Sequence, residues 1–205
     1  MPTVKGALDA REELANRLVD EAGKLLSAEG AAGLSLRRLA TAAGTSTMAV
    51  YTLFGDKQGL LAAMYRAGYE RLGAVMQAAV APDDDALTAL ANLGLGYRRA
   101  ALANPHLYDL MFGRPVPSFD PDPADKAVAD STYQPLLDGV QRCLDAGALV
   151  DRSGKGAEHI ASYLWAVSHG MVSLELAGHL DADAAARDAA YIDALILSSA
   201  PFLPG

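Results

Sequence analysis

Hydroxyl side chains, a methionine and a tyrosine are concentrated in the middle of the segment SLRRLATAAGTSTMAVYTLFGDKQGLL, residues 35–61. On a helix covering about residues 46–52, these groups share an outward face. A short helix of this kind can enter the major groove of DNA, and the free amides at its start favour a phosphate. The residues expected on the outward face are Ser46, Thr47, Met48, Tyr51 and Thr52.

Two short helices must position this face. Ser35 can cap the first helix, and Thr45 or Ser46 can cap the second. Ala40 is small enough for the helices to cross, and Gly44 suits the turn between them, because a positive φ is cheap only without a Cβ. This spacing predicts a helix-turn-helix. Its small core is expected to contain Leu36, Leu39, Val50 and Phe54.

The pattern S-L-R-R-L-A-x-x-A-G-x-S-x-x-A-V-Y-x-L-F-x-D-K-x-x-L-L over residues 35–61 resembles the TetR family of transcriptional regulators. The resemblance implies that Tyr51 and Lys57 contact DNA phosphates, with Lys57 in the first turn of the following helix. It also implies backbone contacts from Ser35 and from Arg37 or Arg38, between which the sequence does not decide. Leu53 stands where many members have histidine. The implied recognition-helix residues are Thr45, Ser46, Thr47 and Met48.

A second resemblance covers WAVSHGMVSLELAG, residues 165–178, and NPHLYDLMFG, residues 104–113. These segments are similar to the effector domain of a TetR subgroup marked by a Trp-x-x-x-His-Gly motif. Aromatic and Met side chains around them can line a mostly apolar pocket, or they can simply fill the core. The pair four residues apart in the motif shares a helix face and can equally be a packed pair. The candidate ligand-binding residues are Tyr97, Tyr108, Met111, Phe112, Tyr133, Trp165 and His169.

Helical periodicity extends along almost the whole chain of 205 residues, which predicts an all-α fold. A three-helix helix-turn-helix head is expected in residues 1–55, with a connecting helix at 56–80. Residues 81–205 are expected to form a larger effector-binding and dimerisation domain. The charges support this division, because residues 1–80 carry 9 Lys and Arg against 8 Asp and Glu, whereas residues 81–205 carry 8 against 17. A polyanion would therefore be bound by the N-terminal part.

Other classes of protein fit the sequence poorly. The single cysteine, Cys143, excludes an intrachain disulfide and a thiolate metal site. His106 and Asp109 have no serine in a nucleophile motif near them, and no metal-binding set or cofactor motif is recognisable, so we expect no enzyme and no cofactor. The longest uncharged run near the C-terminus has 16 residues, fewer than the roughly 20 that span a bilayer. We expect a cytoplasmic, nucleoid-associated protein without membrane contact.

The last two helices carry a signal for dimerisation. The helix expected at 156–180 has two apolar faces, and one of them needs a partner. The first face is expected to contain Ile160, Leu164, Val167, Met171 and Leu174, and the second Ala161, Trp165, Val172 and Leu176. With Ile192, Leu195, Ile196 and Ser199, this predicts a homodimer through the last two helices, although a monomeric bundle remains possible.

These features together predict a DNA-binding transcriptional regulator. The partners expected are a palindromic double-stranded operator and a largely apolar small-molecule effector, which would release a repressor from its operator. The alternative is a helical small-molecule-binding protein without a DNA target.

Overall fold

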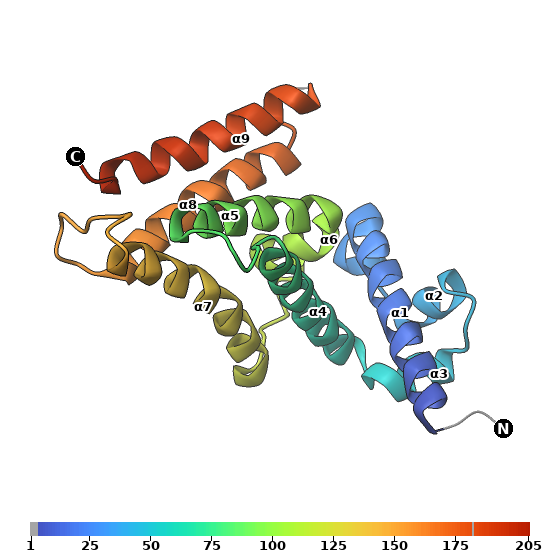
Figure 1. Ribbon diagram of the computed structural model, residues 1–205. Coiled ribbons are helices and arrows are strands. Elements are labelled where there is room, and N and C mark those ends of the chain that lie inside the picture. The colour runs from blue at the N-terminus through green and yellow to red at the C-terminus, as the bar shows by residue number, and fades with distance from the viewer. Residues whose placement is uncertain (1–3, 182) are drawn as a thin grey trace. The chain divides into compact units, whose positions relative to one another are not determined.

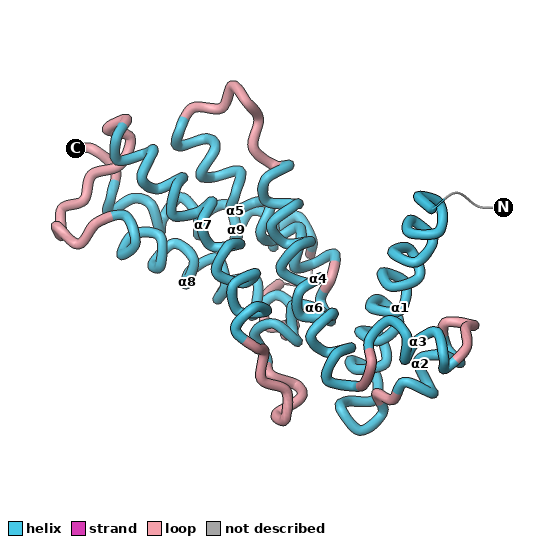
Figure 2. Tube along the Cα trace, turned by 90° about the horizontal axis from the view of Figure 1, so that it is seen from below, coloured by secondary structure: helices cyan, strands magenta, loops and turns pink. Residues whose placement is uncertain are grey.

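The computed structural model describes residues 4–181 and 183–205, and within these ranges every regular element is a helix (Figures 1 and 2). The all-α prediction is therefore confirmed. The helices are α1 Val4–Gly33, α2 Leu36–Ala42, α3 Thr47–Phe54, α4 Lys57–Ala78, α5 Ala86–Ala103, α6 Pro105–Tyr108, α7 Pro123–Asp145, α8 Ala157–Leu176 and α9 Ala184–Ser199. A π-helical turn, Asp109–Gly113, follows α6, and a 3-10 turn, Ala200–Phe202, follows α9.

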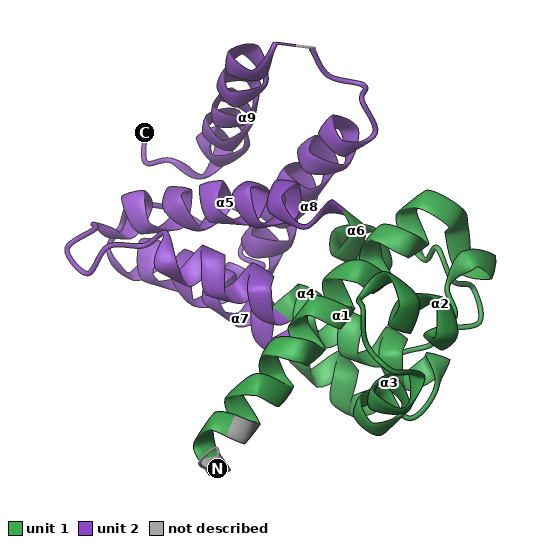
Figure 3. Cartoon of the chain, turned by 90° about the vertical axis from the view of Figure 1, so that its right-hand side faces the viewer, with its two compact units in different colours: residues 1–69, 106–128 green, residues 70–105, 129–205 purple. Residues whose placement is uncertain are grey.

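The chain divides into two compact units (Figure 3). The first contains α1–α3, the part of α4 up to Tyr69, and His106–Val128. The second contains Glu70–Pro105 and Ala129–Gly205, and so holds α5, most of α7, α8 and α9. Helix α4 therefore contributes residues to both units.

Local side chains start the helices where the sequence indicates. Ser35 Oγ accepts a hydrogen bond from Arg38 N at 3.3 Å, and Ser46 Oγ accepts one from Ala49 N at 3.1 Å. Ser46, rather than Thr45, is thus the cap of α3. At the start of α4, Asp56 Oδ1 accepts a hydrogen bond from Gly59 N at 2.8 Å.

The core of the first unit is formed where α1, α2, α3 and α4 meet. The turn between α2 and α3 contains Gly44 at φ 64°, in the left-handed region that a residue with a Cβ rarely adopts. Three of the four predicted core residues are buried, and Phe54 is half-buried. The side chains with no exposed surface include Leu18, Ala22, Leu39, Val50, Leu60, Leu61 and Met64.

Helices α5, α7, α8 and α9 build the second unit. Helix α7 continues through Pro135 as one element. The cluster at its centre combines α5, α7, the α7–α8 connection and α8, and contains Leu90, Val140, Cys143, Leu149, Ile160, Ala161 and Leu164.

The predicted division of α8 into two apolar faces was wrong. The residues buried within the chain are Ile160, Ala161, Leu164, Ser168 and Val172, which draw on both predicted faces. Because one turn takes 3.6 residues, positions 160, 161, 164, 168 and 172 form one continuous sector. Apolar side chains outside this sector, such as Leu174 at 45% exposure, are left on the surface.

Candidate nucleic-acid interface

An open hollow of about 450 Å³ lies on the first unit, where the α1–α2 connection and the start of α2 meet α3 and the start of α4. It brings together Ser35, Arg37, Tyr51 and Lys57, four of the predicted DNA-contacting residues. A hydroxyl, a guanidinium, a phenol and an ammonium group are all hydrogen-bond donors to phosphate oxygens. The remaining residues lining the hollow are Leu34, Leu36 and Asp56.

Lys57 is held at this hollow by the end of α1. Its Nζ donates a hydrogen bond of 2.5 Å to the carbonyl oxygen of Ala31. The chain is non-helical at the adjacent Gly30, with φ 68° and ψ −173°. An ammonium stabilises carbonyls at a helix C-terminus, and it has three donors, so this bond leaves donor capacity for a phosphate.

The two neighbouring arginines differ in their surroundings. Arg38 pairs with Glu29 of α1, with Nη2 at 2.6 Å from Oε1 and a second contact from Nη1 to Oε2. Arg37 instead lines the hollow with Tyr51 and Lys57. The structure therefore places Arg37 with the other predicted phosphate contacts, and it places Arg38 in an ion pair within the head.

The outward face of α3 agrees with the prediction at most positions. Met48 is 75% exposed and Tyr51 is 51% exposed, and Ser46 and Thr52 are also exposed. Thr47, predicted on the same face, is half-buried, as is Thr45 in the preceding turn. Thr52 Oγ1 donates a 2.8 Å hydrogen bond to the Met48 carbonyl oxygen.

In the second unit, four of the predicted ligand-binding residues lie in contact. Tyr97 OH is 3.1 Å from His169 Nδ1, and the rings of Trp165 and His169 are 6.0 Å apart. The ring of Tyr133 meets that of Trp165 edge-on at 5.8 Å. Burial lowers the pKa of His169, which favours the neutral imidazole.

Two serines that were not among the predicted residues extend this group. Ser173 Oγ lies 3.5 Å from His169 Nε2, and Ser162 Oγ lies 3.1 Å from Tyr133 OH. Ser173 follows His169 by four residues on α8, which is a spacing that brings side chains together on a helix. That spacing is the signal that could have identified Ser173.

The other three predicted ligand-binding residues belong to the first unit. The rings of Tyr108 and Phe112 are 4.8 Å apart, and Phe112 also meets the ring of Tyr69 at 5.8 Å. Met111 packs against Gly68 of α4, where an added Cβ would lie 2.5 Å from its sulfur. The predicted set is thus divided into two groups of contacting residues, one in each unit.

A surface of apolar side chains covers α8 and α9 in the single chain. Tyr163 and Leu174 of α8 are 44% and 45% exposed. On α9, Ile192, Ile196 and Leu197 are 46%, 58% and 71% exposed. We call these five residues the α8–α9 surface. Gly170 lies between its α8 members, and nothing lies within 4 Å of a Cβ added there.

A helix-turn-helix head joined to a larger helical unit defines the class of DNA-binding transcriptional regulators. Residues 18–64 match the family model described as bacterial regulatory proteins, tetR family, and residues 90–196 match that described as tetracyclin repressor-like, C-terminal domain. The chain therefore belongs to the TetR family. Among the described residues, no helix is long and apolar enough to cross a membrane.

Known proteins resemble the chain along most of its length. The HTH-type transcriptional regulator Rv1816 of Mycobacterium tuberculosis is 27% identical over 202 residues, covering 85% of this chain and 86% of that protein. A protein of unknown function from Rhodococcus sp. RHA1 is 28% identical with a TM-score of 0.78, covering 93% and 96% of the two chains. The TetR family regulator PfmR of Thermus thermophilus, 20% identical over 90% of this chain and 97% of its own, shares the fold with a TM-score of 0.71.

Proposed function

We propose that this regulator is a repressor that binds a palindromic operator as a homodimer and is released by a small-molecule effector. The observation that carries the proposal is the hollow that gathers Ser35, Arg37, Tyr51 and Lys57 beside the exposed face of α3. Phosphate contacts fix the orientation of a protein on the duplex, and base contacts specify the sequence. In this head the phosphate contacts would come from the hollow and the base contacts from the exposed face of α3 beside it.

The backbone contacts in this proposal come from Ser35, Arg37, Tyr51 and Lys57. Arg38 contributes through its ion pair with Glu29, which ties the start of α2 to α1. The bases are contacted from the exposed part of the segment 45–48, in which Ser46 and Met48 are exposed and Thr45 and Thr47 are half-buried.

The homodimer is supported by the α8–α9 surface. Apolar side chains with exposures of 44–71% on two neighbouring helices are costly to leave in water. A second copy, related by a two-fold axis, would bring the same two helices against them as a four-helix contact. Two heads can then contact two half-sites, which a single eight-residue helix cannot do.

For the effector site, we propose the group around His169, in a domain of the subgroup with a Trp-x-x-x-His-Gly motif. Tyr97, Tyr133, Trp165 and His169 offer aromatic surface with few polar tips, and burial lowers the pKa of His169, which favours the neutral imidazole. Tyr108, Met111 and Phe112, also predicted as ligand-binding, belong to the first unit and form a separate group there. A neutral or cationic, largely apolar effector fits such walls better than a phosphorylated one, because an unpaired buried charge is costly.

In this proposal the protein is a cytoplasmic, nucleoid-associated regulator that performs no catalysis.

The proposal is tested by selecting duplexes from a random-sequence library with the full-length protein. The expected result is an enriched palindrome whose half-site centres lie about one helical turn, or a multiple of it, apart. Failure to enrich any sequence, with only salt-sensitive binding to all duplexes, would contradict the proposal.

A further inference from the structure

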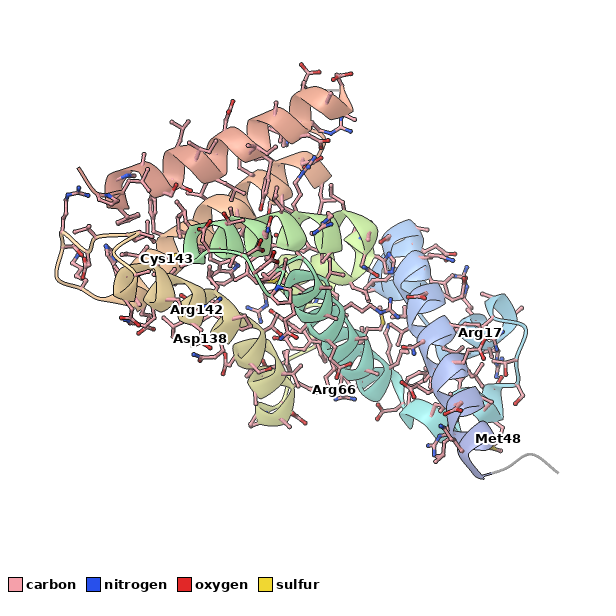
Figure 4. All side chains as sticks on the ribbon, in the orientation of Figure 1. Arg17, Met48, Arg66, Asp138, Arg142 and Cys143 are labelled. Atoms are coloured by element: carbon pink, nitrogen blue, oxygen red, sulfur yellow. The ribbon has the colours of Figure 1, made fainter. Side chains whose placement is uncertain are left out.

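We infer that Met48 recognises a thymine of the operator by contacting its C5 methyl group in the major groove. The inference rests on the proposed operator binding and adds the chemistry by which one base pair is recognised. Met48 is labelled in Figure 4.

The side chain of Met48 is apolar, yet most of it is exposed to water. With 75% exposure it is more exposed than the large hydrophobic residues of the α8–α9 surface. It occupies the first turn of α3, and the N-terminal residues of a recognition helix are those that contact base edges. A partner with apolar surface at that position would remove the side chain from water.

The neighbouring hydroxyl groups of this helix are already engaged. Ser46 Oγ accepts the hydrogen bond from Ala49 N that caps α3, and Thr52 Oγ1 donates to the carbonyl oxygen of Met48. Thr45 and Thr47 are half-buried. Met48 is therefore the side chain of the segment with the most uncommitted surface for a base edge.

The residue types of the segment exclude the commonest kind of base recognition. Residues 45–54 read TSTMAVYTLF and contain no Arg, Lys, Asn, Gln, Asp or Glu. The bidentate pairs that identify guanine and adenine need Arg, Lys, Asn or Gln, so they cannot come from α3. The apolar feature of the major groove is the thymine methyl group, and a flexible thioether adapts its shape to such a contact.

The size of the effect follows from the burial of one methyl group. Removing that group from the duplex should weaken binding about fourfold for one half-site, and about fifteenfold when both half-sites are changed. Uracil differs from thymine only by the missing C5 methyl, so its base pairing and the phosphate backbone stay the same.

The experiment uses a palindromic duplex selected in vitro with the full-length protein. Each thymine of a half-site is replaced by uracil in turn, and the Kd is measured by fluorescence anisotropy for the wild type, Met48→Ala and Met48→Leu. We expect one or two positions at which uracil weakens the wild type about fourfold. At those positions Met48→Ala should change less than about twofold, and Met48→Leu should keep most of the wild-type sensitivity.

Two results would overturn the inference while leaving DNA binding intact. One is a selected duplex whose thymines can all be replaced by uracil without a change in Kd. The other is a loss of affinity with uracil that is equally large in Met48→Ala and in the wild type. If no duplex is selected at all, the proposed operator binding itself fails, which is a different outcome.

Discussion

Arg98 on α5 and Glu175 on α8 form a two-pronged ion pair inside the second unit, with Nε 2.7 Å from Oε2 and Nη2 2.8 Å from Oε1. The two side chains are 12% and 6% exposed. Arg98 also reaches Asp188 of α9 at 2.7 Å, and its guanidinium lies over the ring of Tyr191, 5.4 Å from the centroid. The hydrogen bonds from Arg98 lower the pKa of Glu175, so the carboxylate stays charged although it is buried. One arginine thus joins the two helices that carry the α8–α9 surface to α5.

Arg98→Met should lower the free energy of unfolding by about 3 kcal/mol, because it leaves a buried carboxylate with Arg187 as its remaining charged partner. Urea denaturation of the full chain measures this change. Arg99→Met, at the exposed neighbouring position, is the matched control and should stay within about 0.5 kcal/mol of the wild type. In Arg98→Met/Glu175→Gln the buried charge is gone, so part of the loss should be recovered. If Arg98→Met were as stable as Arg99→Met, the ion pair would not be what joins these helices.

Arg37→Ala and Arg38→Ala should differ in their effect on the salt dependence of DNA binding. Arg37 lines the hollow with Lys57, so its loss should reduce the slope of log K against log salt by about one. Arg38 is bound to Glu29, so its loss should leave the slope nearly unchanged. Anisotropy titrations over a series of salt concentrations make the comparison, with each variant as the control for the other. The opposite ranking would place Arg38, rather than Arg37, on the phosphate.

Ile196→Glu should give a folded monomer, because this side chain is 58% exposed in the single chain and belongs to the α8–α9 surface. Sedimentation velocity measures the mass, and circular dichroism checks the helix content. Leu102→Glu on α5, at 37% exposure, is the control and should remain a dimer. Val172→Glu, at a position with no exposed surface, should unfold the second unit instead. An Ile196→Glu protein that sediments as a dimer would move the interface elsewhere.

Effector binding should change the fluorescence of the protein directly, because Trp165 is the only tryptophan of the chain and lies in the proposed site. It is 38% exposed, so an apolar ligand that covers the indole should shift its emission to shorter wavelength. A panel of apolar phenols, amines and lactones is compared with nucleotides and acyl phosphates, and Tyr97→Phe tests the polar contact to His169. A compound that releases operator DNA without altering Trp165 emission would place the effector site elsewhere.

The sequence was sufficient for the features that depend on neighbouring residues. The cap at Ser35, the turn at Gly44 and the buried Val50 each follow from residue type and a spacing of a few positions. The assignment of Arg37 and Arg38 needed the structure, because Glu29 reaches Arg38 only after α1 has packed against α2.

The ion pair between Arg98 and Glu175 could not be predicted for the same reason, since 77 positions separate the two residues and no periodicity links them. The faces of α8 were misassigned because nearly every position on that helix is apolar or small. The periodicity of the sequence then does not identify the buried face of the helix. That face is decided by the helices that pack against it.

The central claim is that the hollow at the helix-turn-helix head binds the DNA backbone through Lys57, whose ammonium is positioned by the Ala31 carbonyl. The measurement that tests it most directly is the salt dependence of duplex binding by Lys57→Ala, with Lys155→Ala in the second unit as the control. We expect Lys57→Ala to weaken the selected and unrelated duplexes alike and to lower the slope of log K against log salt by about one, whereas Lys155→Ala keeps the wild-type slope. An unchanged slope for Lys57→Ala, with only the sequence preference altered, would contradict the claim.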